Sequence, residues 1–192
     1  PIVALIIIVL LAVLIAYIAV RRRNWLTGIV DTISMVPYIV PGTVIGIALI
    51  TAFKRPITGG MLIMVIALVI RRLPYTIRSS VAILQQIPMS IEEAALSLGS
   101  NKAKTFFKIT MPMMSAGIIS GAILSWVTMI SELSTAIILY SVKTQTLTVS
   151  IYTSVIRGQY GVAAALSTVL TVLTVISLLV FNKFSGGKSV QL

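Results

Sequence analysis

Five apolar segments, each long enough to cross a membrane as a helix, follow one another along the chain and are separated by more polar stretches. A membrane-spanning helix needs about 20 mostly apolar residues. The segments that meet this length are residues 2–20, 32–53, 60–84, 112–140 and 162–181. The second holds Pro37, Pro41, Gly42 and Gly46, so we expect it to be kinked and closely packed against its neighbours. The fourth is longer than one span requires, and we expect it to tilt or break.

Residues 140–161 are more polar than the segments on either side. We expect an external loop there, with a short re-entrant or surface helix. Together these patterns predict an all-α fold: a polytopic membrane helical bundle of five to six transmembrane helices. We expect residues 1–192 to form a single transmembrane domain.

The most polar stretch, residues 90–112, lies between the third and fourth apolar segments and has the sequence SIEEAALSLGSNKAKTFFKITMP. Ser90 followed by Glu93 predicts a capping box at the start of a short helix. Gly99 is expected to end that helix, because glycine accepts the left-handed conformation. Such a helix between two membrane-length segments predicts a cytoplasmic loop that contacts another protein. An amphipathic helix lying in the membrane interface is the alternative.

The composition excludes several classes of protein. Hydrophobic residues make up 58% of the chain, charged residues 10%, and the mean hydropathy is +1.09, which argues against a soluble globular protein. Cysteine and histidine are absent, which removes disulfides, thiolate metal sites and the usual general base. We therefore expect no catalytic residue and no metal site. The net charge of +11 is better explained by cytoplasmic loops facing anionic lipid than by nucleic-acid binding.

Residues 187–189, Gly-Lys-Ser, look like the end of a phosphate-binding loop. That motif also needs a glycine five residues earlier, where Asn182 stands. We expect this chain not to be an enzyme and to bind no cofactor.

The distribution of lysine and arginine predicts an orientation in the membrane, because cytoplasmic flanks carry an excess of both. The basic residues on the side of the 90–112 loop are Arg21, Arg22, Arg23, Lys102, Lys104, Lys108, Lys183 and Lys188. Those on the opposite side are Lys54, Arg55, Lys143 and Arg157. With five spans, this predicts an external N-terminus and a cytoplasmic C-terminus.

Glu132 lies deep inside the fourth apolar segment, where a carboxylate is costly unless it faces a polar cavity or meets a cation. Arg71 and Arg72 lie near the middle of the third segment. Two interpretations stay open: an internal ion pair that locks two helices together, or a translocation path on which the arginines attract an anion and Glu132 a cation. Tyr75 adds an oxygen to such a path, although a packed aromatic is the simpler interpretation.

The 90–112 loop also resembles the EAA loop of ABC importer permeases. The residues that match its spacing are Glu93, Ala94, Ala95, Gly99, Ile109 and Pro112. Met111 stands where that family usually has leucine. The runs VPYIVPGTVIGIALI, RRLPYTIRSS, SWVTMISELSTAIILY and RGQYGVAAALS extend the likeness to residues 37–179. They are similar to the ferric-iron branch of the type I ABC importer permeases.

This resemblance implies an inner-membrane permease that works with several partners. They are a second permease domain, a dimer of cytoplasmic ATP-binding subunits, an extracytoplasmic solute-binding protein and the lipid bilayer. ATP and Mg²⁺ are then bound by the partner subunits. It further implies that the helix from Glu93 to Gly99 docks on an ATP-binding subunit. The chain is then a fragment, or one half, of a longer permease.

The substrate implied by the resemblance is ferric iron. The alternative is phosphonate or another oxyanion, since permeases for such solutes are similar and two arginines suit an anion. A more remote alternative is a secondary transporter that works without ATP.

Overall fold

The computed structural model describes residues 1–22, 24–53 and 60–184, and within these ranges the chain is helical and forms no strand. The all-α prediction is confirmed. Some predictions concern residues outside the described ranges: the charges of Arg23, Lys54, Arg55 and Lys188, and the Gly-Lys-Ser sequence at 187–189.

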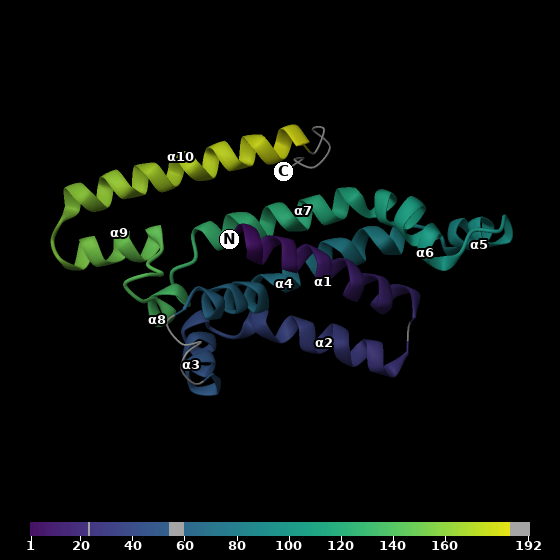
Figure 1. Cartoon of the computed structure of the whole chain (residues 1–192), viewed down its shortest axis with the longest axis horizontal. Helices are drawn as coiled ribbons and strands as arrows, with labels where there is room; N and C mark the ends of the chain where they lie inside the picture. The colour runs from purple at the N-terminus through teal and green to yellow at the C-terminus, as the bar shows by residue number, and fades with distance from the viewer. Residues whose placement is uncertain (23, 54–59, 185–192) are drawn as a thin grey trace.

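Three long helices lie together and form the centre of the bundle (Figure 1). They are α1 (Ile2–Arg21), α4 (Met61–Gln86) and α7 (Met111–Ile130), and α4 packs against both others. Gly117 and Gly121 of α7 make the close approach to α4 possible. A Cβ on Gly117 would lie 2.7 Å from the Ser79 carbonyl oxygen, and one on Gly121 would lie 2.7 Å from the Thr76 Cα. Small residues bring the two helix backbones together in this way.

The second apolar segment is two helices, α2 (Trp25–Ile39) and α3 (Gly42–Ala52), which meet at an angle of 109°. The kink predicted there is confirmed and lies at Pro41, because the residue before a proline is driven out of the helical conformation. The start predicted near residue 32 is wrong. Asn24 begins α2 earlier, since its side chain accepts the Thr27 amide at 2.9 Å and the Thr27 hydroxyl accepts the Asn24 amide at 2.9 Å.

Among the described helices, three are long and apolar enough to cross a membrane: Ile2–Arg21, Lys102–Ile130 and Tyr160–Phe181. The bent pair α2 and α3 adds a fourth if it counts as one span. Helix α4 is 26 residues long and carries three arginines, at positions 71, 72 and 78. Two of them, Arg71 and Arg72, form ion pairs with the buried carboxylate of Glu132.

The fourth apolar segment breaks, as expected. Helix α7 ends at Ile130, and the short helix α8 (Ala136–Leu139) follows after the turn that contains Glu132. The short helix expected in residues 140–161 is α9 (Leu147–Ile156). Helix α10 (Tyr160–Phe184) contacts α9 and α7 and otherwise runs apart from the bundle (Figure 1). A largely apolar cavity of about 800 Å³ lies between α10 and the helices facing it.

Candidate functional site

The 90–112 loop is the one predicted to dock on an ATP-binding subunit, and we call it the coupling loop. It lies at the end of the bundle opposite α8 and α9 (Figure 1). It consists of α5 (Met89–Ser97), α6 (Lys102–Thr105) and a π-helical turn, η1 (Phe106–Thr110), which leads into α7. Helix α5 contacts both α6 and η1, so the two halves of the loop pack on each other.

Helix α5 begins two residues earlier than the capping box predicted from the sequence. Pro88 is the N-cap, its backbone is extended, and its carbonyl oxygen accepts the Ile91 amide at 3.3 Å. Ser90 therefore lies inside the first turn, and no side chain caps this helix. The predicted capping box of Ser90 and Glu93 is wrong, because the proline already supplies the extended residue at which the helix starts.

The end of α5 is as predicted. Gly99 has a φ of +86°, and its amide donates to the Leu96 carbonyl at 3.0 Å while the Ser100 amide donates to the Ala95 carbonyl at 3.1 Å. These two bonds form a Schellman motif. A Cβ on Gly99 would meet nothing within 4 Å, so glycine is needed there for its backbone conformation and not for space.

The surface of the loop is exposed and partly apolar. Glu93 and Ala94 are exposed, whereas Ala95 is buried. Leu98 is 90% exposed and Phe107 is 64% exposed. Large apolar side chains exposed beside charged ones are typical of a surface that another protein covers.

Ile109 and Pro112 lie at the other end of the loop, where the helix changes its hydrogen-bond register. The Met111 amide donates to the Phe106 carbonyl, five residues back, which is the π-helical pattern. Pro112 has no amide hydrogen for the carbonyl four residues before it, so the α-helical ladder is already interrupted here. Such π turns are frequent at functional sites. Ile109 is half-buried and Pro112 is exposed.

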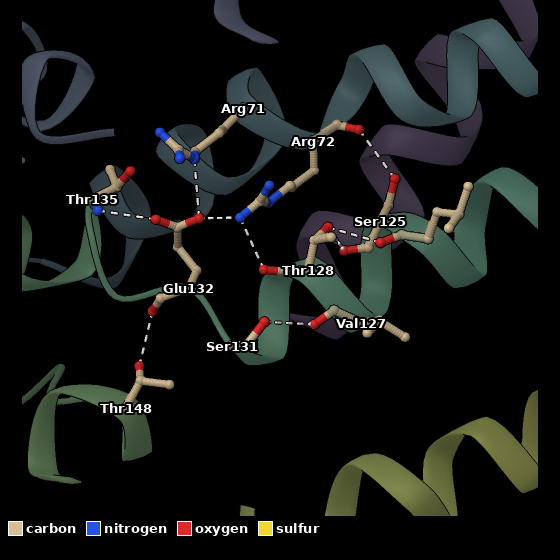
Figure 2. Close-up of polar contacts among 10 residues, drawn as sticks. Arg71, Arg72, Ser125, Val127, Thr128, Ser131, Glu132, Thr135 and Thr148 are labelled. Atoms are coloured by element: carbon tan, nitrogen blue, oxygen red, sulfur yellow. Dashed lines mark hydrogen bonds and ion pairs between the residues drawn. The ribbon is translucent and has the colours of Figure 1, made fainter. Parts of the chain in front are cut away.

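The second cluster centres on Glu132, in the turn that ends α7 (Figure 2). Glu132 is buried, and its Oε2 atom pairs with Arg72 and with Arg71, whose Nε lies 3.0 Å away. The other carboxylate oxygen, Oε1, accepts the Thr135 amide at 3.0 Å. The Thr148 hydroxyl of α9 donates to the Glu132 carbonyl at 2.9 Å. The carboxylate of Glu132 thus joins α4 to the α7–α8 turn, and its backbone carbonyl connects that turn to α9.

The two arginines are held differently. Arg72 is buried and also donates to the Thr128 carbonyl of α7 at 2.9 Å. Arg71 is partly exposed and lies over the first turn of α3, where a Cβ on Gly42 would clash with its guanidinium and would lie 2.6 Å from the Thr135 hydroxyl. Two cations and one anion leave the cluster with an excess positive charge.

Tyr75 completes the set that the sequence singled out for a translocation path. It is half-buried one turn along α4, with its ring centre 5.8 Å from the Arg72 Cζ and 5.5 Å from the ring centre of Tyr38. The fold therefore brings together Glu132, Arg71, Arg72 and Tyr75. Glu132 follows the C-terminal end of α7, the end near α8 and opposite the loop of α5 and α6 (Figure 1).

Neither Glu92 nor the π turn was predicted from the sequence. Glu92 precedes the EAA glutamate, yet it is buried while Glu93 is exposed. The only signal for this was its spacing of three residues from Ala95, which places both on one face of the helix. In the described part of the chain, no group of three or more histidine, cysteine, aspartate or glutamate residues is arranged to hold a metal ion.

Several known proteins are similar to this chain. The ferric transport system permease protein FbpB of Actinobacillus pleuropneumoniae is 34% identical over 180 residues, which are 92% of this chain and 26% of that protein. The Fe(3+)-transport system permease protein FbpB 2 of Haemophilus influenzae is 25% identical over 180 residues, 92% of this chain and 36% of that protein. The molybdate/tungstate transport system permease protein WtpB of Pyrococcus abyssi is 30% identical over 157 residues, 81% of this chain and 62% of that protein. The chain thus spans about a quarter to two thirds of the length of these relatives.

The family model for the inner membrane component of binding-protein-dependent transport systems matches residues 2–185, almost the whole chain. That match agrees with the helical bundle described above. The chain belongs to the family of binding-protein-dependent transport system inner membrane components.

Proposed function

We propose that this chain is the membrane-spanning part of an ATP-driven importer that carries ferric iron into the cytoplasm. Residues 1–192 form one permease domain in this proposal, with the C-terminus in the cytoplasm. A solute-binding protein delivers the substrate from outside, and a pair of ATP-binding subunits supplies the energy. A second permease domain completes the path across the membrane.

The observation that carries this proposal is the exposed loop from α5 to η1. It presents Glu93, Leu98 and Phe107 to solvent at one end of the bundle. Glu93 and Leu98 lie on the stretch that Gly99 terminates, and Phe107 lies in η1. The loop lies at the end where the lysines of α6 are exposed, and an excess of positive charge favours the cytoplasmic side. A groove on an ATP-binding subunit is the partner that this surface fits, with Glu93, Ala94, Ala95, Gly99, Ile109 and Pro112 as the coupling residues.

The substrate assignment rests on similarity to the two ferric permeases, together with the charged cluster. In this proposal Glu132, Arg71, Arg72 and Tyr75 lie along the translocation path. The carboxylate suits a cation, while the excess positive charge suits the anion that accompanies a chelated ferric ion.

An oxyanion such as phosphonate or molybdate is the second candidate. Two observations favour it: the cluster has more arginines than carboxylates, and a molybdate/tungstate permease is 30% identical to this chain. The two candidates share the importer architecture and differ only in what the cluster admits.

The test is uptake into proteoliposomes that hold the permease containing this chain, its ATP-binding subunits and its binding protein. Labelled ferric iron and labelled molybdate are offered in parallel, with ATP or with a non-hydrolysable analogue inside. We expect iron uptake that requires ATP hydrolysis. Molybdate uptake without iron uptake would move the assignment to an oxyanion. Uptake of either solute without ATP would contradict the importer and support a secondary transporter.

A further inference from the structure

Glu92 is anchored to a helix that is remote from it in sequence. Arg21 Nε of α1 lies 2.8 Å from the Glu92 Oε1, and the Tyr17 hydroxyl of α1 donates to Oε2 at 3.1 Å. Tyr17 and Arg21 are four residues apart, so they lie on one face of α1. Both oxygens of the carboxylate are thereby occupied, and helix α5 is fastened to the last turn of α1. We call Tyr17, Arg21 and Glu92 the α1 latch.

The α1 latch touches the coupling loop on both sides of α5. Arg21 Nη2 also donates to the carbonyl of Ile87 at 3.0 Å. Ile87 is the C-cap residue of α4. The ring of Tyr17 packs edge-on against Phe106, the first residue of η1, with ring centres 4.8 Å apart. The end of α1 is therefore held by the segment that precedes α5 and by the one that follows α6.

The α1 latch is better shielded from water than the other ion pair near this end of the bundle. The side chains of Arg21 and Glu92 are 8% and 9% exposed, whereas those of Arg78 and Asp31 are 51% and 31% exposed and 3.2 Å apart. Exposed pairs contribute little, because water and salt screen them. Loss of one partner from a buried pair leaves an uncompensated charge and is strongly unfavourable. The Arg21–Glu92 contact thus resists separation in a way that the Arg78–Asp31 contact does not.

Helix α1 shares a buried core with residues on either side of Glu132. Ile8 of α1 is fully buried in a core that also contains Met129 of α7 and Ala136 of α8, on either side of Glu132. Closer to the latch, Val13 and Ala16 of α1 pack in a second core with Leu84 of α4 and Met114 of α7. Close-packed interiors transmit displacement of one helix to the helices around it.

We propose that the α1 latch makes α1 move together with the coupling helix when the ATP-binding subunits displace it. Tyr17, Arg21 and Glu92 are then positioning residues, which carry the displacement along α1 to the residues around Glu132. This inference rests on the proposed function, since it requires a partner that moves α5. Without the latch, α5 keeps its chain links to α4 and α6, its contacts with α6 and η1 and the packing of Ile91 on the second core, but it loses its polar contacts with α1. In this proposal α1 then follows the movement of α5 less closely.

The experiment compares ATP hydrolysis and solute uptake in proteoliposomes that contain the complete importer. For Glu92→Gln we expect ATP hydrolysis to continue while uptake per ATP falls about tenfold, within the usual range of allosteric coupling. The double variant Arg21→Glu with Glu92→Arg exchanges the two charges, and we expect it to recover part of the lost uptake per ATP. Asp31→Asn breaks the exposed pair at the same end of the bundle and serves as the control, with an unchanged ratio.

Tyr17→Phe removes one hydrogen bond from the α1 latch and keeps the ring that packs on Phe106. It therefore serves as the second variant if Glu92→Gln fails to accumulate in the membrane. We expect uptake per ATP to fall about threefold, which corresponds to the lower end of the range for the loss of one hydrogen bond. Two results would contradict the proposed role of the α1 latch: unchanged uptake per ATP in the variants that accumulate in the membrane, or an equal fall in uptake per ATP in Asp31→Asn. An importer without ATP-dependent uptake in its unaltered form would instead contradict the proposed function, and the latch with it.

Discussion

Arg72 and Glu132 are 60 residues apart in sequence and form an ion pair where α7 ends. Arg71, the neighbour of Arg72, reaches the same carboxylate oxygen. Of the two interpretations that the sequence left open, the ion pair is thus present in the fold. A place on the translocation path stays a proposal, which the following two predictions address.

Replacement of Glu132 by glutamine leaves two arginines without their counter-charge. Removal of one partner of a buried ion pair costs about 3–5 kcal/mol. We expect Glu132→Gln to lower both the unfolding temperature of the purified permease and its uptake of solute. Asp31→Asn, in the exposed pair with Arg78, is the matched control, and its effect on stability should stay below about 1 kcal/mol. Equal unfolding temperatures for the two variants would contradict the buried ion pair.

The double variant Glu132→Gln with Arg72→Gln separates structure from transport. It removes one positive and one negative charge, so much of the lost stability should return. We expect uptake to stay low if these groups line the path. The readouts are the unfolding temperature and ATP-dependent uptake, measured on the same preparation. Recovery of uptake together with stability would favour a purely structural role.

Gly99 and Gly158 form a natural pair for testing the coupling helix. Both have positive φ, of +86° and +72°, and at both a Cβ would meet nothing within 4 Å. Alanine in this conformation costs about 1–2 kcal/mol at either position. We expect Gly99→Ala, and more strongly Gly99→Asp, to reduce ATP-coupled uptake, because the loop that we propose to dock on the ATP-binding subunit changes shape. Gly158→Ala, at the turn before α10, should keep the coupling, and a similar loss there would point to general strain.

Glu93 is exposed, so its reversal to lysine should leave the fold of the bundle intact. We expect Glu93→Lys to accumulate normally in the membrane and to abolish ATP-coupled uptake, since it changes the surface that we propose to dock on the ATP-binding subunit. Lys143→Glu is the control, because it reverses another exposed charge, near α9 at the opposite end of the bundle. We expect the permease with this substitution to take up solute normally. Normal uptake by Glu93→Lys would remove the role assigned to the loop.

Gly42 leaves room for the Arg71 guanidinium and the Thr135 hydroxyl. Gly42→Ala should therefore displace Arg71 from Glu132 and lower the unfolding temperature. Gly28 lies inside α2, where a Cβ would meet nothing within 4 Å, so Gly28→Ala should stabilise the helix by about 0.5–1 kcal/mol. The unfolding temperatures of Gly42→Ala and Gly28→Ala, each compared with the unaltered permease, test these two expectations. A stable Gly42→Ala permease would show that Arg71 is free to move without loss.

The helices of this protein follow closely from its sequence, because long apolar runs, Pro41 and Gly99 act locally. The bend between α2 and α3, the break after α7 and the end of α5 were all predicted on that basis. The start of α5 was not, since the capping pattern of Ser90 and Glu93 competes with Pro88, and the proline sets the start.

Contacts between distant segments are harder to predict. The depth of Glu132 and of the two arginines in apolar segments suggested an ion pair, because an unpaired charge there is costly. For Glu92 no such signal existed: a glutamate beside an exposed glutamate, in a polar loop, gives no sign that it meets Arg21 of another helix. That pairing depends on the packing of α1 against α4, which local pattern does not specify.

Because α7 ends inside the bundle, Arg71 and Arg72 also have different electrostatic surroundings. The last carbonyls of a helix carry a partial negative charge, of about half an elementary charge in total, and its first amides carry a matching positive charge. Arg72 donates to the Thr128 carbonyl, one of the last carbonyls of α7, and so lies between two negative groups. Arg71 lies over Gly42 at the positive end of α3 and has Glu132 as its counter-charge. The excess charge of the cluster is therefore concentrated on the more exposed of its two arginines.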